Sequence, residues 1–490
     1  NADANVDDGS CTYPDNGDYA LSFDGVDDYV DFGYPLFDEF SSTGSFSVSI
    51  DIKNPENLVG GRLVTYISQD PDNSFSLVLS SSQNGEGVSF ELCNISGTSN
   101  NSCSTISGVL DDPTQLNRIT ATYDQGEMKL FSNDNLLSTG MYDGPEAQVS
   151  ESSRLMLGRS WWTNSWSEES SYLGTMDNFS IWDEALTLVQ IQSLLENELD
   201  VAPNMLGFWN FNSNEGELLY DLTGNQNHGT IVGATWEEVI SGCTDLFAEN
   251  YNADASMDDG SCTYLDNGNY VLNFDGVDDI VSLTKSGPTG NSARSIHFRL
   301  KINNFDTPNG ILNYGNNEYG AWGQRIQVEV NTDGDLVLDN NGSWAKFSGV
   351  VTDNSFHDYI LVLQEGDLLN QFILYKDGVL YNIDDMGGQI SQTTNTTDHP
   401  LEFGFIFPGP GFEAYLNGSL DRVQIWDVAF TYEDVQMYMQ NLSDFYEYGL
   451  VGDWKFNSGS GDILYDHSGN QNHGTIVGAT WEGLALQPIL

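Results

Sequence analysis

NQNHGTIVGATW occupies residues 225–236 and returns, letter for letter, at residues 470–481. FDGVDDYV at residues 23–30 likewise returns as FDGVDDIV at residues 274–281, at nearly the same spacing. The chain is therefore a tandem of two copies of a unit of roughly 245 residues. A repeat of that length is a whole domain and not one turn of a solenoid.

Each copy is dominated by short alternating segments that predict β-strands, such as SFSVSIDIK at residues 45–53 and RSIHFRLKI at residues 294–302. One helical segment interrupts the strands in each copy, LVQIQSLLENEL after Thr187 and YEDVQMYMQNL after Thr431. Thr431 and Asp434 have the spacing of a capping box. The pattern predicts two antiparallel β domains, each with one short helix.

The net charge of −58 comes from a shortage of basic residues, because Lys and Arg total 15 and charged residues make up only 18% of the chain. Such a surface repels nucleic acid and anionic membranes, so we expect neither as a partner. The acidity has two explanations: a coat suited to a salty medium, or carboxylates balanced by bound divalent cations. No apolar stretch reaches the roughly 18 residues of a membrane span, so no membrane insertion is expected.

Five cysteines occur at positions typical of disulfides. Cys243 and Cys262 flank one linker segment, and Cys93 and Cys103 flank a short polar loop. Cys11 aligns with Cys262, so we expect its partner outside the chain, in a longer precursor or in a neighbouring molecule. Disulfides point to an oxidising compartment, and we expect a secreted, extracellular or cell-surface protein that is part of a longer precursor.

The order of these motifs resembles that of laminin-G-like modules of the concanavalin A-like lectin/glucanase superfamily. The motifs are FDGVDDYV, a run of strands, IWD before a short helix, and finally YDLTGNQNHGT or YDHSGNQNHGT. The Cys-bracketed acidic segments resemble the linker repeats of large bacterial surface adhesins and, less closely, thrombospondin type 3 calcium repeats. The resemblance implies an all-β fold of two antiparallel jelly-roll β-sandwiches in tandem, commonly with calcium and often with carbohydrate or protein ligands.

On this basis the chain divides into five segments. They are a truncated acidic linker (1–17), a first sandwich (18–240), an acidic linker with a candidate calcium loop (241–266), a second sandwich (267–483) and an apolar tail (484–490).

Both linkers place oxygen-bearing side chains at nearly every second position, a spacing suited to the six to eight oxygen ligands of calcium. The candidate ligands are Asn252, Asp254, Ser256, Asp258 and Asp259, and in the first linker Asn1, Asp3, Asn5, Asp7 and Asp8. The alternative is a solvated, disulfide-pinned turn rich in Asx residues.

The resemblance suggests a second, structural calcium in the loop that precedes the repeated peptide. Its candidate ligands are Asp221, Asn225 and Asn227 in the first copy and Asp466, Asn470 and Asn472 in the second, with Asp177 and Asp421 as further candidates. The alternative is an Asx-rich hairpin. The FDGVDD turns are expected to be hairpins rather than metal sites, and His228 and His473 are expected to cap turns because no zinc ligands lie near them.

Aromatic loops carry the binding hypothesis. The corresponding stretches of the two copies contain Trp161, Trp162 and Trp166 in one, and Phe405, Phe407 and Phe412 in the other. Exposed rings could stack on sugar faces or contact a protein; the alternative is that they close one end of the sandwich. Because the two stretches differ, the two domains are not expected to share one ligand.

Catalytic motifs are missing from the sequence: it has no paired-carboxylate string of a glucanase, no G-x-S-x-G, no HExxH and no Gly-rich phosphate loop. We therefore predict a non-catalytic, calcium-stabilised adhesin or lectin-like array that binds carbohydrate or a surface protein. The alternative is a structural protomer that binds copies of itself in an extracellular filament or sheath, through Cys11 and the apolar tail.

Overall fold

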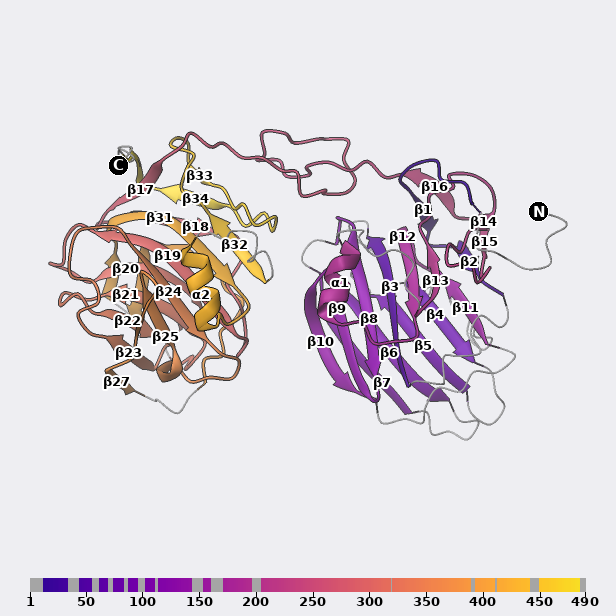
Figure 1. The fold of residues 1–490 in the computed structure, drawn as a ribbon, viewed down its shortest axis with the longest axis horizontal. Coiled ribbons are helices and arrows are strands. Elements are labelled where there is room, and N and C mark those ends of the chain that lie inside the picture. Colours follow the sequence, from indigo (N-terminus) through magenta and orange to yellow (C-terminus); the bar gives the residue numbers. More distant parts are fainter. Residues whose placement is uncertain are drawn as a thin grey trace. The chain divides into compact units, whose positions relative to one another are not determined.

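The computed structural model describes residues 12–33, 44–54, 61–68, 74–82, 87–95, 102–110, 113–142, 153–159, 171–195, 204–318, 320–388, 393–409, 412–440 and 449–484 (Figure 1). The chain forms two compact units, a first domain of residues 1–244 with 252–259 and a second domain of residues 245–251 with 260–490. The predicted linker is therefore shared, because one part of it packs with each domain.

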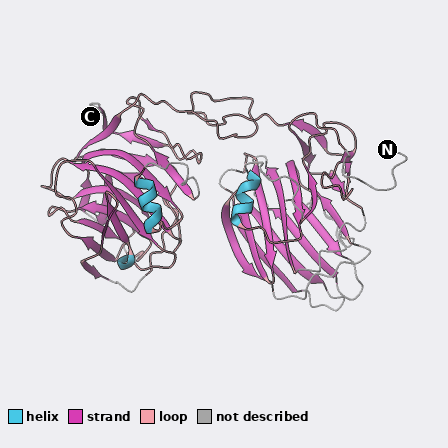
Figure 2. Ribbon diagram, in the orientation of Figure 1, coloured by secondary structure: helices cyan, strands magenta, loops and turns pink. Residues whose placement is uncertain are grey.

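The described part of the first domain contains two antiparallel sheets (Figure 2). One sheet has the order β10-β9-β8-β3-β12-β1-β16, with β13 also paired to β12. Its strands are β1 (Tyr19–Asp24), β3 (Ser45–Lys53), β8 (Asn117–Asp124), β9 (Glu127–Ser132), β10 (Asn135–Met141), β12 (Leu173–Trp182), β13 (Met205–Trp209) and β16 (Thr235–Glu238).

The second sheet of this domain has the order β14-β15-β2-β11-β4-β5-β6-β7. Its strands are β2 (Tyr29–Asp31), β4 (Arg62–Ser68), β5 (Ser74–Ser81), β6 (Gly87–Ile95), β7 (Ser102–Val109), β11 (Arg154–Leu157), β14 (Leu218–Leu219) and β15 (Gly229–Val232). Alternation on β3 explains why the sheets pack together, since Phe46, Val48, Ile50 and Ile52 all enter the core between them.

In the second domain the first sheet has the order β26-β25-β24-β19-β31-β17-β35, with β32 also paired to β31. Its strands are β17 (Tyr270–Asp275), β19 (Arg294–Ile302), β24 (His357–Leu363), β25 (Ile373–Lys376), β26 (Val379–Tyr381), β31 (Asn417–Trp426), β32 (Leu450–Trp454) and β35 (Thr480–Gly483). This order matches that of the first domain strand for strand.

The facing sheet has the order β27-β23-β22-β21-β20-β28-β18-β34-β33. Its strands are β18 (Ile280–Leu283), β20 (Asn309–Gly315), β21 (Arg325–Val330), β22 (Leu336–Asp339), β23 (Ser343–Phe347), β27 (Asp385–Gly388), β28 (Glu402–Phe403), β33 (Ile463–Leu464) and β34 (Gly474–Val477). A short 3-10 helix, η2 (Leu369–Gln371), and a separate hairpin of β29 (Phe405–Gly409) and β30 (Phe412–Tyr415) complete the described elements. The predicted tandem of two-sheet antiparallel sandwiches is confirmed.

A helix packs on the outer face of a sheet in each domain, α1 (Leu188–Leu195) in the first and α2 (Tyr432–Met439) in the second (Figure 2). The capping box of α2 is present, because the Asp434 amide donates to the Thr431 hydroxyl at 3.2 Å and the Thr431 amide donates to the Asp434 carboxylate at 2.7 Å. Within the described ranges, neither helix has the length and apolar character needed to cross a membrane.

Candidate functional site

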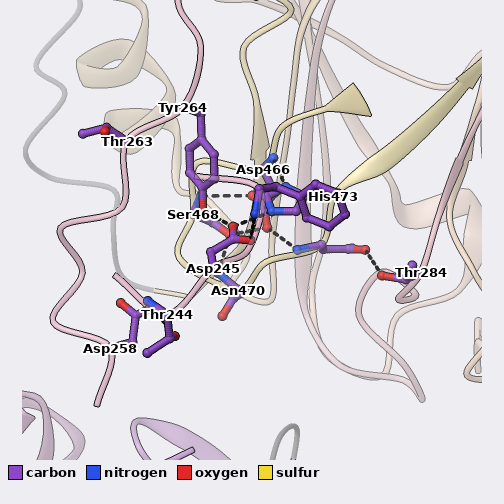
Figure 3. A network of polar contacts seen from close by, with 12 residues as sticks. Thr244, Asp245, Asp258, Thr263, Tyr264, Thr284, Asp466, Ser468, Asn470 and His473 are labelled. Carbon is purple, nitrogen blue, oxygen red and sulfur yellow. Dashed lines mark hydrogen bonds and ion pairs between the residues drawn. The ribbon is translucent and has the colours of Figure 1, made fainter. Parts of the chain in front are cut away.

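In the second domain, the loop after β33 is organised around the carboxylate of Asp466, which is fully buried. Its oxygens accept hydrogen bonds from the backbone amides of Asp453 (2.9 Å), Ser468 (3.0 Å) and Asn472 (2.9 Å), and from the Ser468 hydroxyl (2.9 Å) (Figure 3). The Asn470 side chain donates to two carbonyls of β32. Asp466 therefore already has four donors in a turn rich in Asx residues, as in the alternative to a calcium loop; a calcium ion at this loop stays a prediction.

The first domain repeats this arrangement around Asp221, which is also fully buried. Asp221 accepts from the amides of Phe208 (3.3 Å), Thr223 (3.0 Å) and Asn227 (2.9 Å), and from the Thr223 hydroxyl (2.7 Å). The side chains of Asn225 and Asn227 both donate to one carbonyl of β13 at 3.1 Å. The repeated peptides thus build turns that share the same buried aspartate acceptor.

His228 and His473 cap these turns. The Asp221 amide donates to Nδ1 of His228 at 3.0 Å, and the Asp466 amide donates to Nδ1 of His473 at 2.9 Å. Because Nδ1 is the acceptor in both rings, Nε2 carries the hydrogen and points away from the turn. In the second domain Nε2 meets the carboxylate of Asp245 at 2.6 Å (Figure 3).

The candidate calcium ligands of the second linker make hydrogen bonds within the first domain. Asp258 accepts from the amide and the hydroxyl of Thr244 (3.3 and 2.7 Å), and the Asn252 side chain accepts from the Asp254 amide (3.1 Å). The Ser256 hydroxyl accepts from a backbone amide beyond β16 (3.0 Å). Asp254, Asp258 and Asp259 do not bring their carboxylate oxygens to one point, whereas two other groups of three aspartates among the described residues do. The corresponding ligands of the first linker, Asn1, Asp3, Asn5, Asp7 and Asp8, lie outside the described residues.

The two groups of three aspartates lie in the FDGVDD turns, for which the sequence predicted hairpins rather than metal sites. Asp24, Asp27 and Asp28 bring oxygens within 4.8 Å of one another, and Asp275, Asp278 and Asp279 do the same. Burial, followed by the charges of the neighbouring aspartates, raises the pKa of Asp28 and of Asp279. The sequence signal was an aspartate at the first, fourth and fifth positions around a glycine, which a hairpin turns toward one point.

The strands below α1 hold a buried ion-pair cluster. Arg118 donates to both oxygens of Asp51 at 2.6 and 2.7 Å, and the Asn178 side chain bridges Asp51 (3.0 Å) and Asp177 (3.1 Å). Burial and the charge of Asp51 raise the pKa of Asp177 well above its usual range. Asp177 is therefore part of this buried cluster, and its candidate calcium role stays a prediction.

In the second domain the same cluster has its charges exchanged between strands. Asp51 of β3 lies opposite Arg118 of β8, whereas on the equivalent strands β19 and β24 it is Arg299 that lies opposite Asp358. Arg299 pairs with Asp358 at 2.9 Å and with Asp421 at 2.7 Å. The candidate calcium role of Asp421 likewise stays a prediction.

The aromatic residues of the second domain lie on the β29–β30 hairpin. The Phe405 ring packs on Tyr415 at 5.1 Å between centroids, while Ile406 between the two phenylalanines is fully buried. The backbone of Phe412 lies in β30, and its side chain is not described. Trp161, Trp162 and Trp166 of the first domain lie outside the described residues.

This hairpin lies against β20 and β21 on the outer face of the nine-stranded sheet. Asn313 of β20 donates to the Phe405 carbonyl at 3.0 Å, and Arg325 of β21 donates to the Phe407 carbonyl at 2.8 Å. A side chain at Gly310 would collide with the backbone of the hairpin, which explains the glycine at that position.

A hollow of about 590 Å³ lies beside the hairpin, between residues 316–318 and the segment of residues 397–407, which is about 80 residues further along the chain. Its lining is Asn316, Asn317, Glu318, Thr397, Asp398, His399 and Phe407. Asp398 and His399 are exposed, and within the described residues neither side chain has a hydrogen-bond partner. Of the lining residues, the sequence singled out Phe407 alone, because the others are separated by loops whose folding it does not reveal.

The disulfide between Cys93 and Cys103 joins directly opposed positions of β6 and β7. Cys243 and Cys262 are both disulfide-bonded. Cys11 lies outside the described residues, so its predicted external partner stays a prediction.

Comparison with known proteins identifies one sequence family. The family model described as "Concanavalin A-like lectin/glucanases superfamily" matches residues 24–192 and residues 275–436, one match in each domain. No protein with a curated description matches the chain.

Solved structures with similar arrangements include laminin and carbohydrate-binding proteins. Domains LG4-5 of the mouse laminin alpha1 chain are 12% identical over 86% of this chain and 94% of that chain, with a TM-score of 0.29. A putative carbohydrate binding protein from Bacteroides ovatus is 14% identical over 64% of this chain and 76% of that chain, with a TM-score of 0.35. A heptameric SAP-like pentraxin from Limulus polyphemus is 19% identical over 37% of this chain and 83% of that chain, with a TM-score of 0.28.

Proposed function

Because the chain belongs to the concanavalin A-like lectin/glucanases superfamily through both of its domains, we propose that it is a secreted, non-catalytic binding protein whose second domain binds carbohydrate. Disulfide-bonded cysteines in both domains support the extracellular location. The observation that carries the carbohydrate proposal is the hollow beside Phe407.

The chemistry of this hollow suits a sugar. Sugar hydroxyl groups donate and accept at once, so they pair well with side-chain amides and carboxylates, here those of Asn317, Glu318 and Asp398. The half-buried ring of Phe407 offers an apolar surface on which the C–H face of a sugar can pack. The volume of about 590 Å³ lies within the range of small-molecule sites, roughly 300–1,000 Å³.

The charged side chains that line the hollow restrict the class of sugar that can bind. Glu318 and Asp398 are two carboxylates facing the hollow, with His399 as the single group there that can become cationic. The two carboxylates would repel an anionic sugar. We therefore expect neutral oligosaccharides as ligands of the second domain.

A glycan array probed with the full chain, followed by calorimetry on the best neutral ligand, tests this proposal. Phe407→Ala should weaken binding at least tenfold, because it removes the apolar platform and keeps the backbone carbonyl bonded to Arg325. Phe405→Ala is the matched control, since it is on the same strand outside the hollow, and it should leave affinity within about twofold. Equal losses in both variants, or none in either, would contradict the proposal.

We further propose that the protein binds calcium. The two FDGVDD turns, each with three carboxylates within 4.8 Å, support a hard divalent cation, and the linker ligands remain candidates from the sequence. The fit differs between the sites. Asp466 and Asp221 already accept four hydrogen bonds each and offer little to a metal, whereas Asp27 and Asp278 in the FDGVDD turns are exposed.

Chelation should lower stability, because an ion that binds only the folded state adds about 2.7 kcal/mol at a free concentration of about 100 times its Kd. Metal analysis and thermal melts of the full chain, with and without EDTA, measure this. Asp27→Asn with Asp278→Asn should reduce the bound calcium if the FDGVDD turns hold it; Asp254→Asn with Asp258→Asn should do so if the linker holds it. An unchanged melt after chelation, with no calcium in the purified protein, would refute the proposal.

The filament alternative depends on Cys11 and on residues 485–490, which lie outside the described residues. It stays a sequence-based prediction. Ligand binding by Trp161, Trp162 and Trp166 of the first domain also stays a sequence-based prediction.

A further inference from the structure

The first domain contains a cavity of about 140 Å³ between α1 and the outer face of the sheet on which it packs. Among the described residues, the polar part of its lining consists of Ser49, Arg118, Asn178 and Ser180, which lie on β3, β8 and β12. The apolar part includes Leu194 of α1 and Phe208 of β13. The cavity therefore offers both hydrogen-bonding groups and apolar surface to a molecule inside it.

Strand register shows which residues of the second domain correspond to the serines of this cavity. Ser49 of β3 lies opposite Ser180 of β12. On the equivalent strands β19 and β31, His297 lies opposite Gln424. Two small side chains of the first domain thus stand where the second domain has two large ones.

A tyrosine of the helix fills the corresponding place in the second domain. The shared IWD motif before each helix aligns Leu194 of α1 with Tyr438 of α2. The Tyr438 hydroxyl lies 3.0 Å from Nδ1 of His297 and donates to the Gln424 side chain. Its ring meets His297 at 5.0 Å and Trp426 at 5.7 Å between centroids. A phenol ring with its hydroxyl on the sheet is therefore what fits under the helix of this fold.

The hydroxyl of Ser180 has no hydrogen-bond partner within the described residues, although Ser180 is only 3% exposed and lines the cavity. A buried hydroxyl without a partner costs free energy, and a ligand that bonds to it recovers that cost. Ser49, by contrast, is already bonded to Thr120 at 2.9 Å. Ser180 is therefore the group to which a ligand hydroxyl gains most by binding.

The charged groups beside the cavity are already paired or neutralised. Arg118 donates to both oxygens of Asp51. Burial, followed by the charge of Asp51, raises the pKa of Asp177 well above its usual range, which favours its uncharged form. A charged ligand would leave water without gaining a free partner of opposite sign, so the cavity favours a neutral one.

We propose that the cavity under α1 is a second ligand site, which binds a small neutral molecule with a hydroxyl group on an apolar ring. The hydroxyl bonds to Ser180, and the ring packs against Leu194 and Phe208. The size agrees, because a cavity of about 150 Å³ accommodates one benzene ring. This site is independent of the hollow in the second domain.

The probe is p-cresol, which is the side chain of tyrosine as a free molecule, titrated into the full chain and followed by calorimetry and by the NMR signals of the ligand. We expect saturable binding of p-cresol. Toluene, which has the ring but lacks the hydroxyl, should bind about fivefold more weakly. Absence of saturation by p-cresol, or equal affinities for the two molecules, would overturn the proposal.

Variants of the first domain locate the binding. Leu194→Tyr should abolish it, because the chain then supplies its own ring, as Tyr438 does in the second domain. Leu195→Tyr is the matched control, since Leu195 is exposed and outside the lining, and it should leave the affinity within about twofold.

Ser180→Ala tests the hydrogen bond and does not depend on how well the tyrosine variant folds. It should weaken p-cresol about fivefold and leave toluene unchanged. It should not lower the Tm, because the hydroxyl that it removes has no partner within the described residues. Undiminished p-cresol binding in Ser180→Ala, or in a folded Leu194→Tyr, would refute the proposed site.

Discussion

Replacement of Arg118 by leucine is expected to destabilise the first domain by about 3–5 kcal/mol, the cost of leaving a buried charge without its partner. The guanidinium makes two hydrogen bonds to Asp51, and both side chains are almost fully buried, at 10% and 5% exposure. Without it, Asp51 and the neighbouring Asp177 repel each other in a poorly solvated place. Denaturant unfolding of the full chain measures the effect as an earlier transition of the first domain.

The matched control for Arg118→Leu is Arg299→Leu in the second domain. Arg299 pairs with Asp358 and Asp421 but is 39% exposed. Water can therefore solvate the aspartates that Arg299→Leu leaves behind, and the loss of unfolding free energy should be about 1 kcal/mol.

The exchanged arrangement of charges also predicts that a charge swap in the first domain restores stability. Asp51→Arg combined with Arg118→Asp copies the second domain and should recover at least half of the stability lost in Arg118→Leu. Failure of that double variant to fold better than the single one would show that this pair does not act through charge.

Asp466→Ala is expected to cost the second domain about 3–5 kcal/mol, because four donors, two of them buried and two part-buried, lose their acceptor at once. Asp221→Ala should cost the first domain a similar amount, since its turn is built in the same way. Thermal and denaturant unfolding of each variant measure both losses.

The same variants separate a hydrogen-bonding role from a metal-binding role. If Asp466 acts as the acceptor of the turn, its replacement costs the same stability in calcium and in EDTA. A loss seen in calcium alone would instead make Asp466 a metal ligand and would contradict the hydrogen-bonded turn.

Local patterns and the repeat accounted for the fold. Thr431 and Asp434 predicted the cap of α2, and the alternation of residues 45–53 and 294–302 predicted two strands of the sandwiches. These features depend on neighbours in sequence, so they can be read from it.

The site depends on contacts that the sequence does not display. The exchange of charge between Asp51–Arg118 and Arg299–Asp358 follows from strand register, which pairs residues far apart in the chain. The hollow beside Phe407 arises because a hairpin lies across the outer face of a sheet, where Gly310 leaves room for it. Neither arrangement has a local sequence signal.

The most direct test of a carbohydrate-binding second domain is a structure of the full chain with the neutral oligosaccharide that binds it best. We predict a sugar ring packed on Phe407, with hydroxyl groups within hydrogen-bonding distance of Asn317 and Asp398. A sugar bound elsewhere on the molecule, with this hollow filled by water alone, would contradict the account.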